Sequence, residues 1–581
     1  MSITVTTAKN QITTITIAAI KKAISENILK DAQFNDFGIE VPNDRKFGDF
    51  STNAAMVNAK AFSMPPRKIA EAITSNMELT DSYFEKVEIA GPGFINLFLS
   101  DKYYADILLE IEEAGDSYGR SSYGENKKIN VEFVSANPTG PMHIGNARGG
   151  ALGDCLAAVL DWAGYDVSRE FYINDAGNQI DKFALSLDVR YKQIHLGEEN
   201  VPLPEDSYHG MDIMQRAQEF NEIHGDSFMN KSEEERRAAL VEYSLPLNIQ
   251  GMKDAMEKYR IHYDTWFHEL DMHNGGELKE TIDILTKNGY TYSKDGALWY
   301  KNIEIQTEIL KEQGKTDEYI EKLELKDDVL IRANSNPTYF AADIAYHRNK
   351  LEKRGFDKAI DVWGADHHGH VARMKGAMRA LGLDENRFDV LLMQFVRLVR
   401  DGEIVRMSKR TGKAITLVDM LDEIPIDAVR FIFNMREPGS LMDFDLDLAV
   451  EKSSQNPVYY CQYAYARICS ILTKIEAEGK VIRTPREKEL EKLTAPEERE
   501  LIRYLSTLSE VVVNAAKNYD PAKVTHYIIE LATLFHKYYN NCRISVEDDS
   551  LMQARLFLCS CVKNTMKNIF IMLKVDAPER M

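Results

Sequence analysis

The sequence is short of cysteine, of long apolar runs and of positive charge, and each shortage excludes a class of protein. Its 581 residues include six cysteines and no CxxC pair, so neither a disulfide framework nor a zinc site is predicted. No stretch approaches the roughly 18 consecutive apolar residues of a membrane span. The N-terminus lacks the apolar block and cleavage site of a signal peptide. We therefore expect a folded, cytoplasmic protein with no membrane partner.

Basic residues are outnumbered by acidic ones, 71 to 91, which gives a net charge of −20. Because phosphate binding needs clustered Lys and Arg, this balance disfavours a generally cationic nucleic-acid binder. The acidity is uneven, however. Residues 195–328 hold 15 basic and 30 acidic side chains, whereas residues 455–581 hold 18 basic and 16 acidic ones. A selective nucleic-acid partner is therefore still compatible with the charge.

Changes in composition and in hydrophobic pattern divide the chain into five segments. Residues 1–120 mix helical and strand patterns and predict an α+β domain. In residues 121–194 an apolar strand, a Pro/Gly-rich loop, a helix and a second strand follow one another, as at the start of a parallel α/β sheet. Residues 195–328 are polar and mostly helical, and we interpret them as an insertion with a solvated surface. The α/β pattern resumes over 329–454, and 455–581 predict an all-α bundle.

A loop rich in small residues follows the first strand predicted for the sheet. It contains Pro138, Gly140 and Gly145, with His143 and Asn146 near the start of the next helix. Small residues let a backbone approach a phosphate chain, and a helix N-terminus presents free N–H groups to anions. It is not a Walker loop, because GxxxxGK[ST] is absent. An ordinary strand-to-helix turn is the alternative interpretation.

A second, basic loop has the sequence RMSKRTGK over residues 406–413. Its Ser408, Lys409 and Arg410 could clamp a triphosphate through charge-assisted hydrogen bonds. Taken by itself, a solvated basic turn would be the more common explanation.

Together the two loops resemble the HIGH-like and KMSKS-like sequences of class I aminoacyl-tRNA synthetases, which carry them on a Rossmann-type core. The segment FVSANPTGPMHIGNAR at 133–148 looks like the form found in arginyl-tRNA synthetases. Similar stretches recur along the whole chain: FGDFSTNA at 47–54, GPGFIN at 91–96, WGADHHG at 363–369, QNPVYYCQYAYAR at 455–467 and APERM at 577–581. The expected fold class is therefore a multidomain α/β protein. It has a Rossmann-type parallel-sheet catalytic core, a helical insertion, an N-terminal α+β domain and a C-terminal anticodon-binding bundle.

The two motifs depart from the family pattern in places. Asn146 stands where HIGH ends in His, and Arg410 stands where KMSKS ends in Ser, while Arg406 replaces its first Lys. Asn146 can still donate a hydrogen bond to a phosphate or ribose oxygen, and Arg410 adds a cation. The changes leave the detailed geometry open but retain Lys409.

The resemblance implies that arginine is joined to tRNA(Arg) in two steps. The arginine carboxylate attacks the α-phosphate of ATP, and the tRNA ribose then takes the arginyl group. Positioning and charge stabilisation dominate such phosphoryl chemistry. ATP is expected to enter with Mg²⁺, and no permanently bound cofactor is expected. The implied catalytic residues are His143, Asn146 and Lys409, and the further ATP-binding candidates are Pro138, Gly140, Gly145, Met407, Ser408 and Arg410.

An arginine substrate needs carboxylates, because a guanidinium is planar and always charged. Tyr339 and Asp343 lie four apart on one face of a predicted helix and match family positions that bind arginine. Glu132, Ser135 and Asn137 match positions near the end of the first core strand. Strand alternation would aim Ser135 and Asn137 the same way. Without the family context, Asp343 would be taken for a helix-start acid or a surface ion pair.

Two weaker arginine-site candidates are Asp295 and His367. Asp295 precedes Gly296 and could equally be a turn aspartate. A pocket that pairs a guanidinium rejects lysine and neutral side chains by leaving carboxylates unpaired, so no editing domain is expected.

The tRNA is expected to contact both ends of the chain. Aromatic stacking typically recognises unstacked bases, and Tyr459, Tyr463 and Arg467 begin the C-terminal bundle. Core packing of the two tyrosines is equally compatible with the pattern. Phe47 and Asn53 are N-terminal candidates by resemblance alone, and could simply form a turn.

Two rival functions are compatible with parts of the sequence. One is another class I synthetase or adenylyl-transferring enzyme, and the other is a tRNA-binding protein without catalysis. His143 and Lys409, together with the predicted arginine-site acids, argue against the second. The family is mostly monomeric, so a monomer with no DNA partner is expected.

Overall fold

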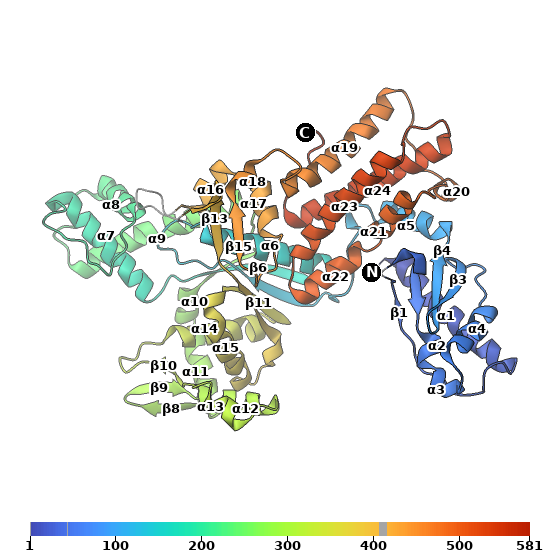
Figure 1. The fold of residues 1–581 in the computed structure, drawn as a ribbon. Helices are drawn as coiled ribbons and strands as arrows, with labels where there is room; N and C mark the ends of the chain where they lie inside the picture. The colour runs from blue at the N-terminus through green and yellow to red at the C-terminus, as the bar shows by residue number, and fades with distance from the viewer. Residues whose placement is uncertain (1, 43, 406–414) are drawn as a thin grey trace.

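The computed structural model describes residues 2–42, 44–405 and 415–581 and shows an elongated molecule of several packed parts (Figure 1). The N-terminal domain lies at one end and a module of three helices at the other. A parallel sheet lies between them, and the C-terminal helices pack beside it, against helix α6 (Gly145–Trp162).

The N-terminal domain is built on a four-stranded antiparallel sheet with the order β1-β2-β4-β3. The strand–turn–strand predicted around residues 91–93 is present. The helix predicted over 51–61 begins later, because Phe50, Ser51 and Thr52 pair with β4 as strand β2. The elements are α1 (Ile3–Ser25), β1 (Ile39–Glu40), β2 (Phe50–Thr52), α2 (Ala54–Val57), α3 (Ala59–Phe62), α4 (Pro66–Asn76), β3 (Phe84–Ala90), β4 (Phe94–Leu99) and α5 (Asp101–Ala114).

The central sheet has five parallel strands in the order β12-β11-β5-β6-β7. The strands are β5 (Lys128–Glu132), β6 (Asp166–Ile173), β7 (Thr265–His268), β11 (Lys358–Gly364) and β12 (Phe388–Met393). From β5 the chain continues to β6 and β7 on one side and later adds β11 and β12 on the other. The order reverses between β5 and β11, and ligands of open parallel sheets bind outside the carboxyl ends of the strands at such a point. The predicted parallel-sheet core is confirmed.

Strand β7 lies inside residues 195–328, which the sequence pattern placed wholly in an insertion. It pairs in parallel with β6, with Phe171 opposite Trp266. A four-residue edge strand is too short to show a period against polar surroundings, so the pattern missed it. The rest of that segment forms two separate parts around β7.

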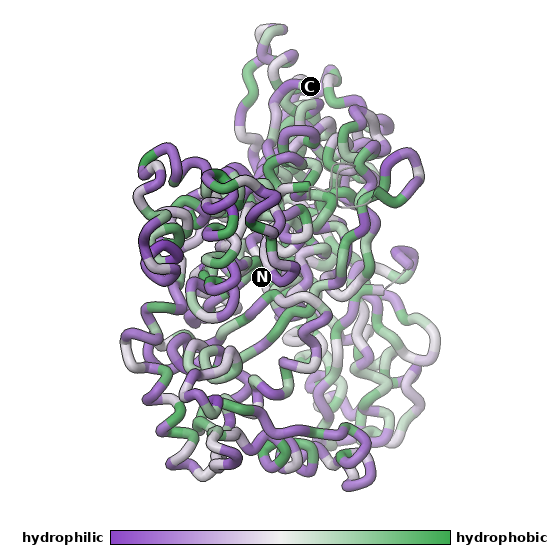
Figure 2. Tube along the Cα trace, turned by 90° about the vertical axis from the view of Figure 1, so that its left-hand side faces the viewer, coloured by the Kyte–Doolittle hydropathy of each residue, from purple (hydrophilic) through white to green (hydrophobic). Residues whose placement is uncertain are grey.

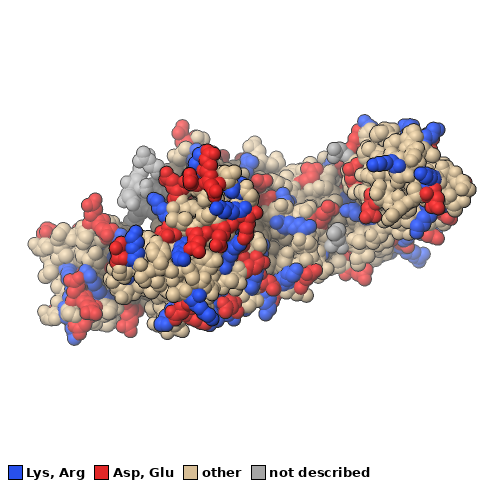
Figure 3. All heavy atoms as spheres, turned by 90° about the horizontal axis from the view of Figure 1, so that it is seen from below, with Lys and Arg blue, Asp and Glu red and all other residues tan. Residues whose placement is uncertain are grey.

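The first part, α8 (Met211–His224) and α9 (Glu233–Lys258), packs with the preceding helix α7 (Asn178–Leu196) into a helical module that has a small core of its own around Phe183, Leu187 and Phe220. The second part is a three-stranded sheet, β10-β9-β8, with flanking helices. Its elements are α10 (Glu269–Asn274), α11 (Glu277–Lys287), β8 (Thr291–Lys294), β9 (Ala297–Tyr300), α12 (Asn302–Glu312), α13 (Asp317–Glu321) and β10 (Asp328–Ile331). Seen from below, acidic side chains gather over this second part (Figure 3).

The remaining core elements carry the second half of the candidate site. Helices α14 (Tyr339–Arg348) and α15 (His368–Ala380) pack on each other beside β11. A third small sheet, β14-β13-β15, follows β12. Its strands and the neighbouring helices are β13 (Val396–Arg400), β14 (Glu403–Val405), α16 (Leu417–Glu423), α17 (Ile426–Phe433), β15 (Met442–Asp445) and α18 (Leu446–Val450).

The C-terminal part is helical, as predicted. Its helices are α19 (Pro457–Ala477), α20 (Glu487–Leu490), α21 (Pro496–Leu505), α22 (Leu508–Asn518), α23 (Ala522–Asn541) and α24 (Asp549–Leu573). The amphipathic pattern over 498–517 is two helices rather than one. The break between the two helices falls at Ser506 and Thr507. Their hydroxyls donate hydrogen bonds to the backbone carbonyls of Arg503 and Tyr504, respectively.

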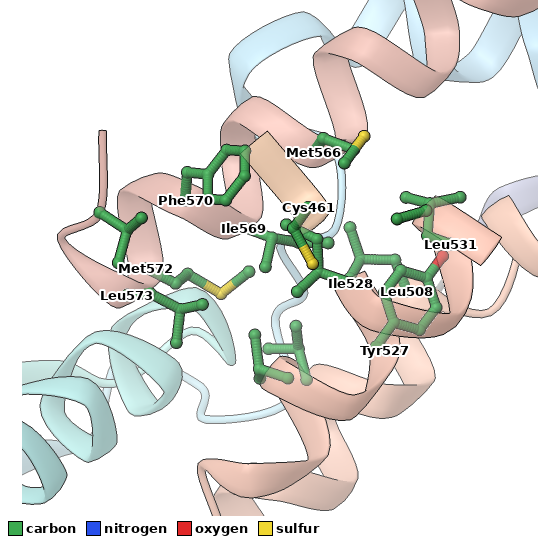
Figure 4. Close-up of a cluster of buried hydrophobic side chains, with 14 of the residues drawn as sticks. Cys461, Leu508, Tyr527, Ile528, Leu531, Met566, Ile569, Phe570, Met572 and Leu573 are labelled. Carbon is green, nitrogen blue, oxygen red and sulfur yellow. The ribbon is translucent and has the colours of Figure 1, made fainter. Parts of the chain in front are cut away.

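Helix α24 is the one helix in the described part of the chain that is long and apolar enough to cross a membrane, and 72% of its most apolar stretch is buried. Ile569, Phe570 and Leu573 of this helix face a cluster that includes Cys461 and Ile528 (Figure 4). Hydrophobic residues likewise run through the interior of the C-terminal helices in a side view (Figure 2). Helix α24 is therefore buried to the extent expected of a helix in the hydrophobic core.

Candidate active site

The chain turns sharply at the carboxyl end of β5. Val134 and Ser135 adopt φ values of 74° and 42°, which are rare for residues other than glycine. The turn brings the Ser135 hydroxyl back to donate to Oε1 of Glu132 at 2.8 Å, and the Tyr172 N–H donates to the same hydroxyl at 3.1 Å. Alternation along a strand therefore does not aim Ser135 and Asn137, because the strand ends at Glu132.

A cavity of about 560 Å³ opens over the loop that follows. The His143 N–H donates to Oδ1 of Asn146 at 3.2 Å, so the amide NH₂ of Asn146 is left as the donor end of that side chain. Helix α6 begins at Gly145 without a side-chain cap, as an anion site at a helix N-terminus requires. The cavity is lined by residues 135–137, 139–143, 146, 179, 208–210 and 212.

Of the predicted ATP-site residues, Gly140, His143 and Asn146 line this cavity. Pro138 is buried beside it, and its carbonyl accepts from the Asn248 amide at 3.1 Å. Asp212, from the helical module, also reaches the cavity and comes so close that a β-carbon on Gly140 would lie 3.1 Å from it. Burial raises the pKa of Asp212, while the charge of His143 opposes that rise.

The flanks of the two sequence motifs lie against each other. His143 and Thr416 form an antiparallel bridge, the Ile144 N–H donates to the Ile415 carbonyl at 3.2 Å, and the Leu417 N–H donates to the Met142 carbonyl at 2.8 Å. Met407, Ser408, Lys409 and Arg410 lie outside the described residues. The segment that returns from them is nevertheless attached to the His143 loop.

A second cavity, of about 320 Å³, opens where the sheet order reverses. It combines the end of β5 with the end of β11 and one face of α14. Its lining residues are Glu132, Val134, Ser135, Tyr172, Asn174, Asp343, Tyr346, His347, Asp361, Val362, Trp363, Gly364, His367 and His370. The structure therefore brings together Glu132, Ser135, Asp343 and His367 from the predicted set. Ser135 lines both cavities, which makes them neighbours.

A fully buried lysine supports the floor of this second cavity. The Lys350 ammonium donates to Oε2 of Glu132 at 2.5 Å and to Oδ1 of Asp361 at 2.9 Å, and His347 contacts Oδ2 of Asp361 at 2.7 Å. Although burial acts to lower the pKa of Lys350, Asp361 and Glu132 raise it. Burial acts to raise the pKa of Asp361, but Lys350 and His347 lower it to about 2. Lys350 and Asp361 are thus held in their charged forms, whereas burial raises the pKa of Glu132 against the opposing charge of Lys350.

Asp343 is the predicted carboxylate most open to the cavity. It lies one turn into α14, whose first turn is capped by Thr338. Its Oδ2 accepts from Nε2 of His370 at 3.0 Å, and 37% of its side chain is exposed. One carboxylate oxygen is thereby oriented by the protein, while the side chain lines the cavity.

Tyr339, four residues before Asp343, faces a third cavity of about 310 Å³. That cavity also contains Glu269, which the sequence pattern missed. Burial raises the pKa of Glu269, and Asp343 adds to the rise, while His273 opposes it through a contact of 3.1 Å. Burial also raises the pKa of Tyr172, and the charges of Glu269 and Asp343 raise it further, so both carboxylates lie near this tyrosine.

Glu269 follows the last residue of β7, at the carboxyl edge of the parallel sheet. A carboxylate directly after a parallel strand is a candidate site residue, so recognition of β7 in the sequence would have identified Glu269. Because β7 was not predicted, Glu269 was not predicted either. Asp295 lies instead at the exposed tip of the β8–β9 hairpin with a φ of 51°. It lines none of the three cavities.

Two of the three predicted C-terminal residues share an exposed cluster. The Arg467 guanidinium lies 4.7 Å from the Tyr463 ring centre and 5.1 Å from that of Tyr539, and it donates to the Tyr463 hydroxyl at 2.6 Å. His536 stacks beside them, 6.1 Å from Tyr463, and both burial and Arg467 lower the pKa of His536. Tyr459 lies apart, in a hollow that also contains the C-terminal Met581.

The N-terminal candidates differ in their surroundings. Phe47 is 43% exposed, and the Lys46 ammonium lies 4.8 Å from its ring centre. Asn53 accepts a hydrogen bond from the Gly38 N–H at 2.8 Å, which is the behaviour of a turn residue. Asp49 between them pairs with Arg503 of α21 at 3.0 Å and so fixes this loop to the C-terminal helices.

Three family models match successive parts of the chain. They are the arginyl tRNA synthetase N terminal domain over residues 13–99, the catalytic domain of tRNA synthetases class I (R) over 110–453, and the DALR anticodon binding domain over 461–581. Together with the parallel sheet and the paired motif flanks, these matches define a class I aminoacyl-tRNA synthetase.

Similar proteins and a similar solved structure show which synthetase family within this class the chain resembles. The chain is 51% identical to the arginine–tRNA ligase of Caldanaerobacter subterraneus subsp. tengcongensis over 99% of both chains, and 48% identical to that of Acetivibrio thermocellus over the full length of both. The Thermus thermophilus arginyl-tRNA synthetase structure shares its fold, with a TM-score of 0.70 and 20% identity over 97% of this chain and 99% of that one. The chain belongs to the arginyl-tRNA synthetase family.

Proposed function

We propose that this chain joins arginine to tRNA(Arg) at the carboxyl edge of its parallel sheet, with ATP as the second substrate and AMP and pyrophosphate as products. The observation that carries the assignment is the antiparallel pairing of residues 142–144 with 415–417. It attaches the segment returning from the basic loop to the loop that carries His143 and Asn146, beside a cavity large enough for a nucleotide. Family membership supports the same reaction.

ATP would occupy the 560 Å³ cavity. His143 and Asn146 would donate to phosphate and ribose oxygens, Gly140 and Gly145 would let the backbone approach, and Pro138 would hold the loop in place. Met407 and Ser408 would contact the nucleotide from the basic loop, while Lys409 and Arg410 would offset charge that grows on the departing pyrophosphate. The support for these four residues is their position in the sequence motif.

Mg²⁺ would arrive with ATP. No group of three or more His, Cys, Asp or Glu in residues 2–42, 44–405 and 415–581 could hold a metal ion. The phosphate oxygens of ATP and water molecules would therefore supply most of its ligands, as is common for Mg²⁺.

Arginine would lie between the two neighbouring cavities of about 320 and 310 Å³. Asp343 and Glu269, each lining one of the two cavities, would pair with the guanidinium, and Tyr339 would close that end. Glu132, Ser135 and Asn137 would bind the amino and carboxylate groups, next to the ATP cavity, with His367 at the rim. The arginine carboxylate would then lie next to the α-phosphate of ATP, as in-line attack requires.

The tRNA would bridge the C-terminal and N-terminal parts. Tyr463 and Arg467 would offer bases of the anticodon loop a stacking surface, with Tyr459 contributing from the neighbouring hollow. Phe47 and Asn53 would contact the outer corner of the tRNA. Because the family usually needs tRNA before it activates arginine, pyrophosphate exchange is expected to depend on tRNA.

The division into segments 1–120, 121–194, 195–328, 329–454 and 455–581 is proposed with one change, namely that β7 is counted with the core. A cytoplasmic monomer is also proposed, since protein synthesis takes place in the cytoplasm and the family is mostly monomeric. Elution of the chain from a sizing column as a dimer would contradict the second part.

The deciding experiment is aminoacylation with ATP, total tRNA and each of the twenty amino acids in turn. Arginine alone should be attached to tRNA. Charging by another amino acid would reassign the substrate. Tight tRNA binding without any charging would instead favour a binding protein that lacks catalysis.

A further inference from the structure

His370 stands between the carboxylate proposed to bind arginine and an arginine of the protein itself. Its Nε2 lies 3.0 Å from Oδ2 of Asp343, and its Nδ1 lies 2.9 Å from a terminal nitrogen of Arg373. The other terminal nitrogen of Arg373 donates to Oδ1 of Asp328 at 2.8 Å. The four groups form one chain from the surface of β10 to the arginine cavity.

The direction of these hydrogen bonds is determined by chemistry. A guanidinium nitrogen can only donate, so Nδ1 of His370 must accept from Arg373 and cannot carry a proton. The single ring proton is then on Nε2, which donates to Asp343. A second proton on the ring would face the Arg373 cation, and Asp328 keeps that cation in place.

The ring itself is fixed by its neighbours on each packed element. Trp363 of β11 lies 5.4 Å from it and Phe340 of α14 lies 5.7 Å from it, both measured between ring centres. The charged or titratable groups that contact the ring directly are Asp343 and Arg373. Only 17% of the His370 side chain is exposed.

We infer that His370, locked as a neutral donor by Arg373, is a positioning residue that keeps the full negative charge of Asp343 available for the guanidinium of arginine. A neutral donor orients the carboxylate without neutralising it. An imidazolium at the same place would form an ion pair with Asp343 and compete with the substrate. The inference rests on the proposed role of Asp343.

The test compares arginine KM in the tRNA-charging assay at about pH 8.5 and about pH 6. Arg373→Met removes the donor to Nδ1, so His370 becomes free to take up a second proton. The variant should behave almost like the wild type at the higher pH. At the lower pH its arginine KM should rise on the order of tenfold or more, while wild-type KM changes little. ATP KM should be unaffected at both values.

Arg379→Met is the matched control. Arg379 lies on the same helix, α15, but pairs with Glu312 and Glu385, away from His370. It should show the wild-type pH profile. The same pH profile in Arg373→Met as in wild type would overturn the inference.

A second pair of variants covers the case in which Arg373→Met does not fold. His370→Leu should raise arginine KM on the order of tenfold at every pH, because Asp343 loses its orienting donor. His370→Gln keeps an N–H donor that cannot titrate, and should recover most of that loss. Equal effects of the two variants would mean that the ring serves only for packing.

The Asp343→Asn variant separates this inference from the proposed function. If Asp343→Asn leaves arginine KM unchanged, the role of Asp343 is wrong, and the inference is wrong with it. If Asp343→Asn raises arginine KM but Arg373→Met has no pH-dependent effect, the inference alone is wrong. In the double variant the pH effect of Arg373→Met should disappear.

Discussion

The arginine cavity and the Tyr463–Arg467 cluster are both built from charged and aromatic side chains, yet their surroundings are opposite. At the cavity, Glu132, Asp361 and Lys350 are buried, and the Lys350 ammonium donates a hydrogen bond to each of the two acids. At the cluster, Tyr463 is 39% exposed and Arg467 rests on the faces of the rings. The first region is pre-organised by the fold, whereas the second is a solvated surface.

The contrast between buried and exposed surroundings indicates how each region can recognise its partner. Asp343 and Glu269, which His370 and His273 contact, would lack a cationic partner if a substrate without a guanidinium were bound, so the site rejects such a substrate. Exposed aromatic faces accept any base that reaches them, and their contribution per contact is smaller and depends on salt. Removing a group from the cavity should therefore cost more than removing one from the cluster.

The largest effect should follow from Lys350→Met, which leaves Glu132 and Asp361 buried without their cation. We expect a loss of about 3–5 kcal/mol in the free energy of unfolding, measured by chemical denaturation. Lys353→Met is the matched control, since Lys353 is part of the same segment but pairs with Glu280 at the surface. Equal losses in the two variants would contradict the contrast between buried and exposed charge.

Asp343→Ala should come next. Loss of one carboxylate from the guanidinium site should raise arginine KM about 100-fold, because a desolvated charge pair loses one partner. Thermal stability and ATP KM should stay close to the wild type. Unchanged arginine kinetics would remove Asp343 from the site.

Glu269→Gln tests the carboxylate that the sequence pattern missed. It keeps the shape of the side chain and its contact with His273 but removes the negative charge, so arginine KM should rise about 10- to 100-fold. The same assay on Asp271→Asn, two residues along α10, should give the wild-type value. A normal KM in Glu269→Gln would leave Asp343 as the sole guanidinium partner.

Tyr463→Ala should affect the other region. We expect tRNA KM to rise about tenfold, the effect of one lost stacking contact, with arginine KM unchanged. Charging should also become less sensitive to salt in Arg467→Ala than in Tyr463→Ala, because only the first removes a cation. A change in arginine KM instead would tie this surface to the catalytic cavity.

The smallest effect is expected from Asp295→Ala. Its carboxylate lies at an exposed hairpin tip, so arginine KM should stay within about twofold of the wild type. A large increase would mean that the hairpin moves to the arginine site during the reaction.

The sequence alone predicted more of the fold than of the site. Strong local signals located the β5–loop–α6 unit, the strand–turn–strand of β3 and β4 and the C-terminal helices. Short β7 was missed, and with it Glu269, because four residues at a sheet edge carry no period. Asp295 was a weaker candidate for the arginine site with a turn aspartate as the alternative, and the local sequence does not give the distance between that turn and the cavity.

Some properties of this protein follow from the sequence by itself. The glycines and helix start at 140–146, the basic loop and the regular apolar spacing of the C-terminal helices are local features, so residue order determines them. Which charged side chains contact each other, in contrast, depends on the tertiary structure. Lys350 pairs with Glu132, and His370 pairs with Asp343, although the two partners of each pair lie on different elements of the chain. Such contacts depend on how elements pack, because each partner lies outside the range of any local period.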